Sequence, residues 1–148
     1  MIQGLGDMGL SLALSAIGSG LGAGVAGEAT IGAWKKMFMR NKAAAMIMMS
    51  FVGAPLSQTI YGMILRNAIK NANLPPETTT YQMILGGVAG FAIGLSAYFQ
   101  GRAGACAADA YGETGKGFAN YIMVLGITET VALFVLAFSL TALPKLAG

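Results

Sequence analysis

Apolar residues run along the chain in four long stretches, at about 8–31, 43–69, 81–108 and 118–143. Each stretch is long enough for a transmembrane helix, which needs about 20 apolar residues to cross a hydrocarbon core of roughly 30 Å. The last stretch is apolar almost throughout and carries one acid, Glu129, near its middle. The pattern predicts an all-α membrane protein with four transmembrane helices.

Polar segments between these stretches divide the chain into two tandem hairpins, 1–72 and 73–148. A basic segment follows the first stretch, residues 71–80 (NANLPPETTT) form an extramembrane loop whose two prolines end any helix, and residues 111–117 (YGETGKG) form a turn. The hairpins also match each other as a parallel repeat. Residues 28–33 (EATIGA) align with 100–105 (QGRAGA) at an offset of 72, and Gln58 aligns with Glu129 at an offset of 71.

Composition supports a membrane protein and excludes several other classes. The 148 residues are 55% hydrophobic and only 10% charged, whereas soluble domains carry about a quarter charged residues. The net charge of +3 comes from cations beside apolar stretches, which excludes a nucleic-acid-binding face. With no His and one cysteine, Cys106, we expect neither a disulfide nor a transition-metal cluster. We also expect no cleaved signal peptide, because Asp7 lies where a positive segment should precede the first stretch.

The distribution of Lys and Arg predicts how the hairpins are oriented in the membrane. The cations near the two turns within the hairpins are Lys35, Lys36, Arg40, Lys42, Arg102 and Lys116, against Arg66 and Lys70 at the opposite face. The positive-inside rule therefore places both turns in the cytoplasm and both termini outside.

Small residues recur at a spacing of four in the first and third stretches. They are Ala16, Gly20 and Gly24, and Gly86, Gly90 and Gly94. This spacing keeps each set on one helix face, where helix backbones can approach closely. The second and fourth stretches are rich in Met and Phe. Helices with small side chains on the inside and helices with large side chains on the outside favour a ring of copies around a narrow axis. The same glycines would also fit a generic close-packed helix bundle.

Two nucleotide-binding patterns can be rejected. Residues 22–27 (GAGVAG) fit the G-x-G-x-x-G pattern of dinucleotide sites, but they lie inside an apolar helix with no preceding strand. The G-x-x-x-x-G-K-[ST] pattern is absent. We therefore expect no ATP hydrolysis by this chain itself.

Glu129 is the main functional candidate. A carboxylate in hydrocarbon costs at least a few kcal/mol unless it is protonated, paired or bound to a cation. Gln100 lies as far before the second hairpin turn as Glu129 lies after it, so the two side chains can face each other at one depth. The simplest alternative is a protonated Glu129 that only hydrogen-bonds a neighbouring helix.

The second stretch adds polar groups around Pro55. A proline removes one backbone donor and clashes with the preceding turn, so nearby carbonyls, including that of Ala54, can point away from the helix. Ser57 and Gln58 follow at once, and Tyr61 is placed one turn later to donate a hydrogen bond to Glu129. Together with Gln100 these groups form an oxygen-only set that suits a hard cation, and a single carboxylate favours a monovalent one. Interhelical hydrogen bonding is the alternative role for the two glutamines.

The same residues resemble a known family. Two fused Gly-rich hairpins, the run 54–61 (APLSQTIY), Gln100 and a lone Glu129 are similar to the V-type (V/A-type) ATPase proteolipid, the c or K subunit of a membrane rotor ring. In its bacterial sodium-pumping members, the resemblance implies that Na⁺ is held by Glu129, Gln100, Gln58, Ser57 and the Ala54 carbonyl, supported by Tyr61. Ser57 stands where threonine is common and Ala54 where a larger residue is common. Glu28 resembles an acid near the cytoplasmic end of the first helix and would be structural or related to ion access.

The resemblance also implies partners and leaves alternatives. It implies a homo-oligomeric ring in a bacterial cell membrane, a stator subunit (a/I type) with an arginine, central-stalk subunits, and ATP hydrolysis in other subunits. H⁺ instead of Na⁺ is the first alternative. The alternatives of other classes are a small multidrug transporter, which also has four helices and one membrane-embedded Glu, and a purely structural or pore-forming ring.

Overall fold

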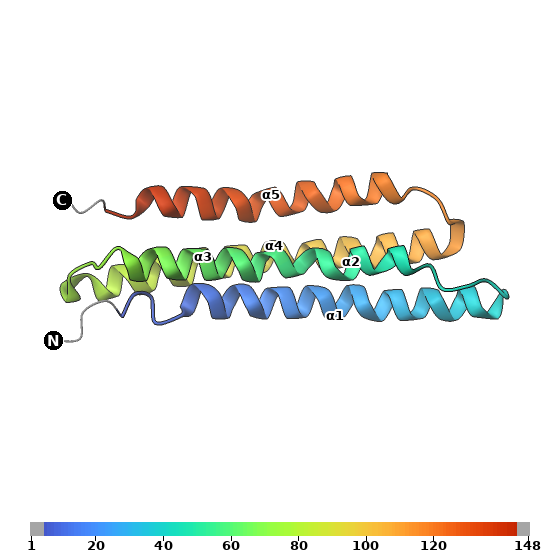
Figure 1. Cartoon of the computed structure of the whole chain (residues 1–148), viewed down its shortest axis with the longest axis horizontal. Helices are drawn as coiled ribbons and strands as arrows, with labels where there is room; N and C mark the ends of the chain where they lie inside the picture. Colours follow the sequence, from blue (N-terminus) through green and yellow to red (C-terminus); the bar gives the residue numbers. More distant parts are fainter. Residues whose placement is uncertain (1–4, 145–148) are drawn as a thin grey trace.

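The computed structural model describes residues 5–144. These residues form four long antiparallel helical rods, and each rod is long and apolar enough to cross a membrane. The rods are α1 (Leu10–Met39); η1 (Met46–Met48), α2 (Met49–Gly53), η2 (Ala54–Leu56) and α3 (Ser57–Asn71); η3 (Pro76–Thr78) and α4 (Thr79–Thr114); and α5 (Phe118–Ala142). Figure 1 shows the two connections within the hairpins at one end and the chain termini at the other. The predicted all-α fold with four membrane-spanning helices is confirmed.

The helices extend further than the apolar stretches predict. α1 continues to Met39, so Lys35 and Lys36 lie on its last turns rather than after it. α4 continues to Thr114, because a helix can extend into water after its apolar residues end. The helix ends at Gly115, which has a left-handed φ of 66°. Arg102, which we counted with the cations around the second turn, lies inside α4 as the stretch 81–108 predicts, about 18 Å from the last residue of the helix at 1.5 Å per residue.

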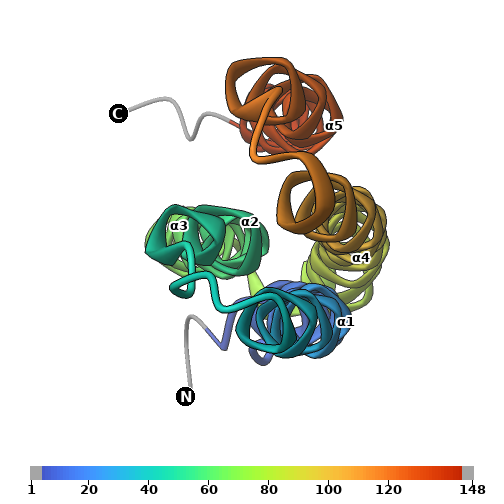
Figure 2. The ribbon, with the colours of Figure 1, turned by 90° about the vertical axis from the view of Figure 1, so that its right-hand side faces the viewer.

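α1 and α4 pack in direct contact through residues without large side chains. A Cβ added to Gly18 would overlap the backbone of Gly94, and one added to Gly101 would overlap the backbone of Gly22. The predicted contact stripe on the third stretch is thereby confirmed. Gly20 and Gly24 of the stripe predicted on the first stretch do not contact α4, because a Cβ on either would meet nothing within 4 Å. Figure 2 shows α1 beside α4, with α2 and α3 on one side of the pair and α5 next to α4.

Close contacts set the register between α1 and α4. Gly18 lies against Gly94, and Ala33 lies against Gly112, so contacting residues are 76 and 79 positions apart. The first hairpin has the longer connection, with six residues, 40–45, between α1 and η1, against three, 115–117, in the second. At these offsets Glu28 does not lie level with Gln100.

Two apolar clusters hold the rods together. The cluster nearer the hairpin turns surrounds Phe51, whose ring lies 5.5 Å from that of Phe118 between centroids. The cluster nearer the termini joins Leu65 and Ile69 of α3 to Ile93 of α4 and Leu136 of α5. Between the clusters lies a short polar segment, which contains the candidate site.

Candidate ion-binding site

The backbone break at Pro55 positions the first part of the site. Pro55 lacks an N–H group, so the carbonyl of Phe51 has no partner four residues later, and the α-helix gives way to the 3-10 turn η2 at Ala54–Leu56. The Phe51 carbonyl instead lies against Gly104 of α4, where a Cβ would come within 2.7 Å of its oxygen. α3 restarts at Ser57, which directs Gln58 into the interior.

Two fully buried glutamines connect α3 to α4. Gln58 and Gln100 are both 0% exposed. Nε2 of Gln58 donates a 2.8 Å hydrogen bond to Oε1 of Gln100. Ser57 lies beside them, with its Oγ 3.1 Å from Oε1 of Gln58 and 3.1 Å from the Ala54 carbonyl oxygen. The Ala54 carbonyl, the Ser57 hydroxyl and both glutamine amide oxygens therefore lie next to one another.

Glu129 completes this group from α5. Nε2 of Gln100 donates to Oε2 of Glu129 at 3.3 Å, and the phenol of Tyr61 donates to Oε1 at 2.6 Å. Glu129 is half-buried, eleven residues after the start of α5 and thirteen before its end. The carboxylate is thus held from α3 and from α4 near mid-height of the helical rods.

Sequence reasoning missed two further hydrogen bonds that fix the site. Nε2 of Gln100 also donates to the Leu125 carbonyl at 2.9 Å, which orients the amide. Ser96 Oγ donates to the Thr128 carbonyl at 2.8 Å and so joins α4 to α5 beside Glu129. The Ser96 contact had a signal in the sequence, because Ser96 precedes Gln100 by one helical turn. A backbone carbonyl such as that of Leu125 leaves no such signal.

Of the seven residues that the sequence singled out, the structure brings six together and separates one. Glu129, Gln100, Gln58, Ser57, Ala54 and Tyr61 form one hydrogen-bonded group. Glu28 is exposed on α1 and belongs to no hydrogen bond among residues 5–144. Its level on α1 is about five residues, or roughly 8 Å, nearer the hairpin turns than Gln100.

The chemistry of this group suits a small cation or a proton. The group contains one carboxylate, and no Lys or Arg hydrogen-bonds to it among residues 5–144. The Nε2 group of Gln100 and the Tyr61 hydroxyl contact the carboxylate, and the oxygens of Gln58, Ser57 and Ala54 follow behind Gln100 in the same hydrogen-bonded group. Hard cations prefer a carboxylate together with neutral oxygens of this kind. A monovalent cation would neutralise the single charge, whereas a divalent one would leave excess positive charge in an apolar region.

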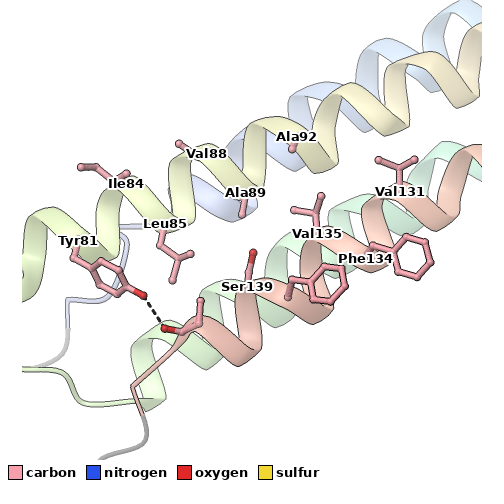
Figure 3. A pocket seen from close by; sticks show the side chains of 12 residues that line it. Tyr81, Ile84, Leu85, Val88, Ala89, Ala92, Val131, Phe134, Val135 and Ser139 are labelled. Carbon is pink, nitrogen blue, oxygen red and sulfur yellow. Dashed lines mark hydrogen bonds between the residues drawn. The ribbon is translucent and has the colours of Figure 1, made fainter.

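An apolar groove lies elsewhere on the surface. It has a volume of about 700 Å³ and runs between α4 and α5 toward the termini. Figure 3 shows Ile84, Val88 and Phe134 along it, and the Tyr81 phenol donating to the Ala142 carbonyl at 2.8 Å near one end. Since no charged residue lines this groove, it is not a second ion site.

Comparison with known proteins gives one match, to the second hairpin. Residues 83–142 match the sequence model of the family of the ATP synthase C subunit. No curated protein matches the chain. The matched segment covers most of α4 and all of α5, and therefore includes Gln100 and Glu129. The match makes this segment similar to the ATP synthase C subunit and leaves α1, α2 and α3 outside it.

Proposed function

We propose that this chain is the ion-carrying subunit of a homo-oligomeric rotor ring in a V-type rotary ATPase, and that each copy carries one Na⁺ on Glu129. The ion would enter from one side of the membrane, turn with the ring through the bilayer, and leave where a stator arginine competes for the carboxylate. Partner subunits would hydrolyse ATP and drive the ring through a central stalk. The chain itself would then be no enzyme.

The observation that carries the proposal is the buried chain of amides. Gln58, Gln100 and Glu129 are joined by hydrogen bonds of 2.8 and 3.3 Å. A proton needs only the carboxylate, whereas a dehydrated Na⁺ needs several oxygen ligands. Two amides that are 0% exposed, together with the hydroxyl of Ser57, supply such ligands from both hairpins.

The duplicated hairpin supports the V-type assignment. Gln58 stands in the first hairpin where Glu129 stands in the second, so one carboxylate serves four helices. Fewer ions then cross per turn of the ring, which suits ATP-driven pumping rather than synthesis.

The orientation of the chain in the membrane is part of the same proposal. Lys35, Lys36, Arg40 and Lys42 lie at the turn end of the first hairpin and Lys116 at that of the second, whereas Arg66 and Lys70 lie at the terminal end. Without Arg102 the bias still favours turns in the cytoplasm and termini outside, in a bacterial cell membrane.

Carbodiimide labelling of Glu129 in the purified ring tests the bound ion. The reagent attacks the protonated acid, and bound Na⁺ keeps the acid ionised, so Na⁺ at neutral pH should slow labelling. Protection should weaken as the pH falls, because protons compete for the same carboxylate. Glu129→Gln should abolish both labelling and transport. Choline at equal ionic strength is the control for salt effects.

Each alternative has its own outcome. If Na⁺ in the millimolar range does not change the rate of labelling, the role in a rotor ring stands and the coupling ion is H⁺. A dimer rather than a large ring in native mass spectrometry would favour the small multidrug transporter. Ion transport that survives Glu129→Gln would indicate a purely structural ring.

A further inference from the structure

Two opposite charges lie within the helical rods without a partner among the residues that the structure describes. Glu28 on α1 and Arg102 on α4 are exposed, and neither forms a hydrogen bond or ion pair within residues 5–144. Lys36, nearer the turn end, is different, since its Nζ lies 2.8 Å from Asp109 and 3.3 Å from Glu113. A charge at membrane depth is costly unless it is paired or reaches water, so Glu28 and Arg102 each require a partner.

Glu28 continues a stripe on α1 that nothing in the chain covers. Gly20, Gly24 and Gly32 lie four or eight residues from it, and a Cβ at any of the three would meet nothing within 4 Å. By contrast, Gly18 and Gly22 of the same helix contact α4. α1 therefore has a second face, turned away from its own α4, with Glu28 on it, and the side chains of Leu21 and Ile31 are exposed beside Glu28.

Arg102 lies on the corresponding uncovered face of α4. Leu95, Phe99 and Cys106, at nearby positions on this helix, are also exposed. The level of Arg102 follows from the contacts between the helices, because Gly22 lies against Gly101 and Ala26 against Gly104. Arg102 is thus level with residue 24 or so of α1, and Glu28 lies about four residues, or roughly 6 Å, along the axis. The long arginine side chain can span that distance.

The parallel repeat indicates which α4 meets this face. α1 and α4 run in the same direction and pack side by side, and a ring of identical copies places α1 of a following copy on the free side of α4 at an unchanged height. The uncovered face of α1 then meets the uncovered face of a neighbour's α4 at similar height. We propose that Glu28 of one copy forms an ion pair with Arg102 of the adjacent copy, and that this pair sets the register between neighbours in the ring. The inference rests on the proposed ring.

Charge reversal tests the pair and separates contacts between copies from contacts within one. Glu28→Arg alone places two arginines at every interface, and Arg102→Glu alone places two glutamates there. Each variant alone should lose most of its intact ring in native mass spectrometry. When the two variant chains are expressed together and alternate around a ring, every interface again opposes one arginine to one glutamate, so mixed rings should form. No single chain in the mixture holds an opposite pair, so a contact within one chain cannot give this rescue.

The native Cys106 provides a second readout. Cys106 lies one turn after Arg102, level with Glu28, and is exposed. Mild oxidation of Glu28→Cys should produce a ladder of disulfide-linked multimers. Cys106→Ala in the same background should remove the ladder, and Ala23→Cys, five residues before Glu28 and therefore on a different face of α1, should give little of it.

The outcomes separate this inference from the ring itself. Three outcomes would each overturn the ion pair while leaving the ring in place. They are intact rings in both single-reversal variants, failure of the mixed chains to form rings, and disulfides found only within monomers. A wild-type chain that never forms a large oligomer would overturn the proposed function and the pair together.

Discussion

The phenol of Tyr61 on α3 donates a 2.6 Å hydrogen bond to the Glu129 carboxylate on α5. This contact links the first hairpin to the residue proposed to carry the ion. Tyr61 is half-buried beside Glu129, so the hydrogen bond is partly shielded from competing solvent.

Tyr61→Phe should weaken ion retention while leaving the ring intact. A hydrogen bond to a charged group contributes about 1.5–3 kcal/mol, so Na⁺ affinity should fall roughly ten- to a hundred-fold. Protection of Glu129 from carbodiimide then requires correspondingly more Na⁺. Tyr81→Phe is the matched control, because its phenol bonds the Ala142 carbonyl away from the site. Equal losses in both variants would contradict a specific role for Tyr61.

Gln100→Ala and Gln58→Ala should each reduce Na⁺ affinity. Removing one oxygen from a desolvated ion costs about 1–3 kcal/mol, or roughly ten- to a hundred-fold in affinity. Equilibrium binding of radioactive Na⁺ to purified rings measures the loss. Gln82→Ala is the control, since Gln82 is 3% exposed but bonds Thr78 outside the site. Unchanged binding in both site variants would remove the amides from the ligand set.

Pro55→Ala should raise stability and lower ion affinity. Alanine restores a backbone N–H and is about 3 kcal/mol more favourable than proline in a helix interior, so Tm should rise. A continuous helix would turn the Ala54 carbonyl back into the backbone hydrogen-bond ladder and away from Ser57. Thermal unfolding and Na⁺ binding should therefore change in opposite directions. Pro75→Ala in the loop between the hairpins should leave Na⁺ binding unchanged.

Gly18→Ala should destabilise the chain by about 1–3 kcal/mol, because the added methyl group would overlap the Gly94 backbone. Gly126→Ala on α5 provides the contrast. A Cβ there meets nothing within 4 Å, and alanine favours the helix by up to about 1 kcal/mol. Unfolding in graded denaturing detergent measures both, and similar Tm values for the two variants would contradict the close packing of α1 on α4.

The sequence identified the four helices and the residues of the site because both leave local signals. Apolar length indicates the spans, and equal distances from a turn place Gln100 beside Glu129. The packing faces of α1 were harder to predict. Ser11, Ser15 and Gly22 form one small face and Gly20 and Gly24 another, and spacing alone does not tell which of them contacts α4.

Arg102 was counted with the cations of the second turn although it lies inside the predicted stretch 81–108, six residues before its end. α4 continues to Thr114, which adds a further six residues between Arg102 and the turn.

The two apolar clusters on either side of the polar segment have a kinetic consequence. The cluster nearer the turns joins α2, α4 and α5, and the cluster nearer the termini joins α3, α4 and α5, so the helices around the site have little freedom to separate. The Glu129 side chain, in contrast, is half-buried and held by only two hydrogen bonds. We therefore expect the carboxylate to exchange partners by rotation about its own side-chain bonds. Such rotations take nanoseconds or somewhat longer, whereas collective helix movements take microseconds to milliseconds. Ion exchange at Glu129 would then be faster than rotation of the ring, and another part of the proposed ATPase would limit the rotation rate.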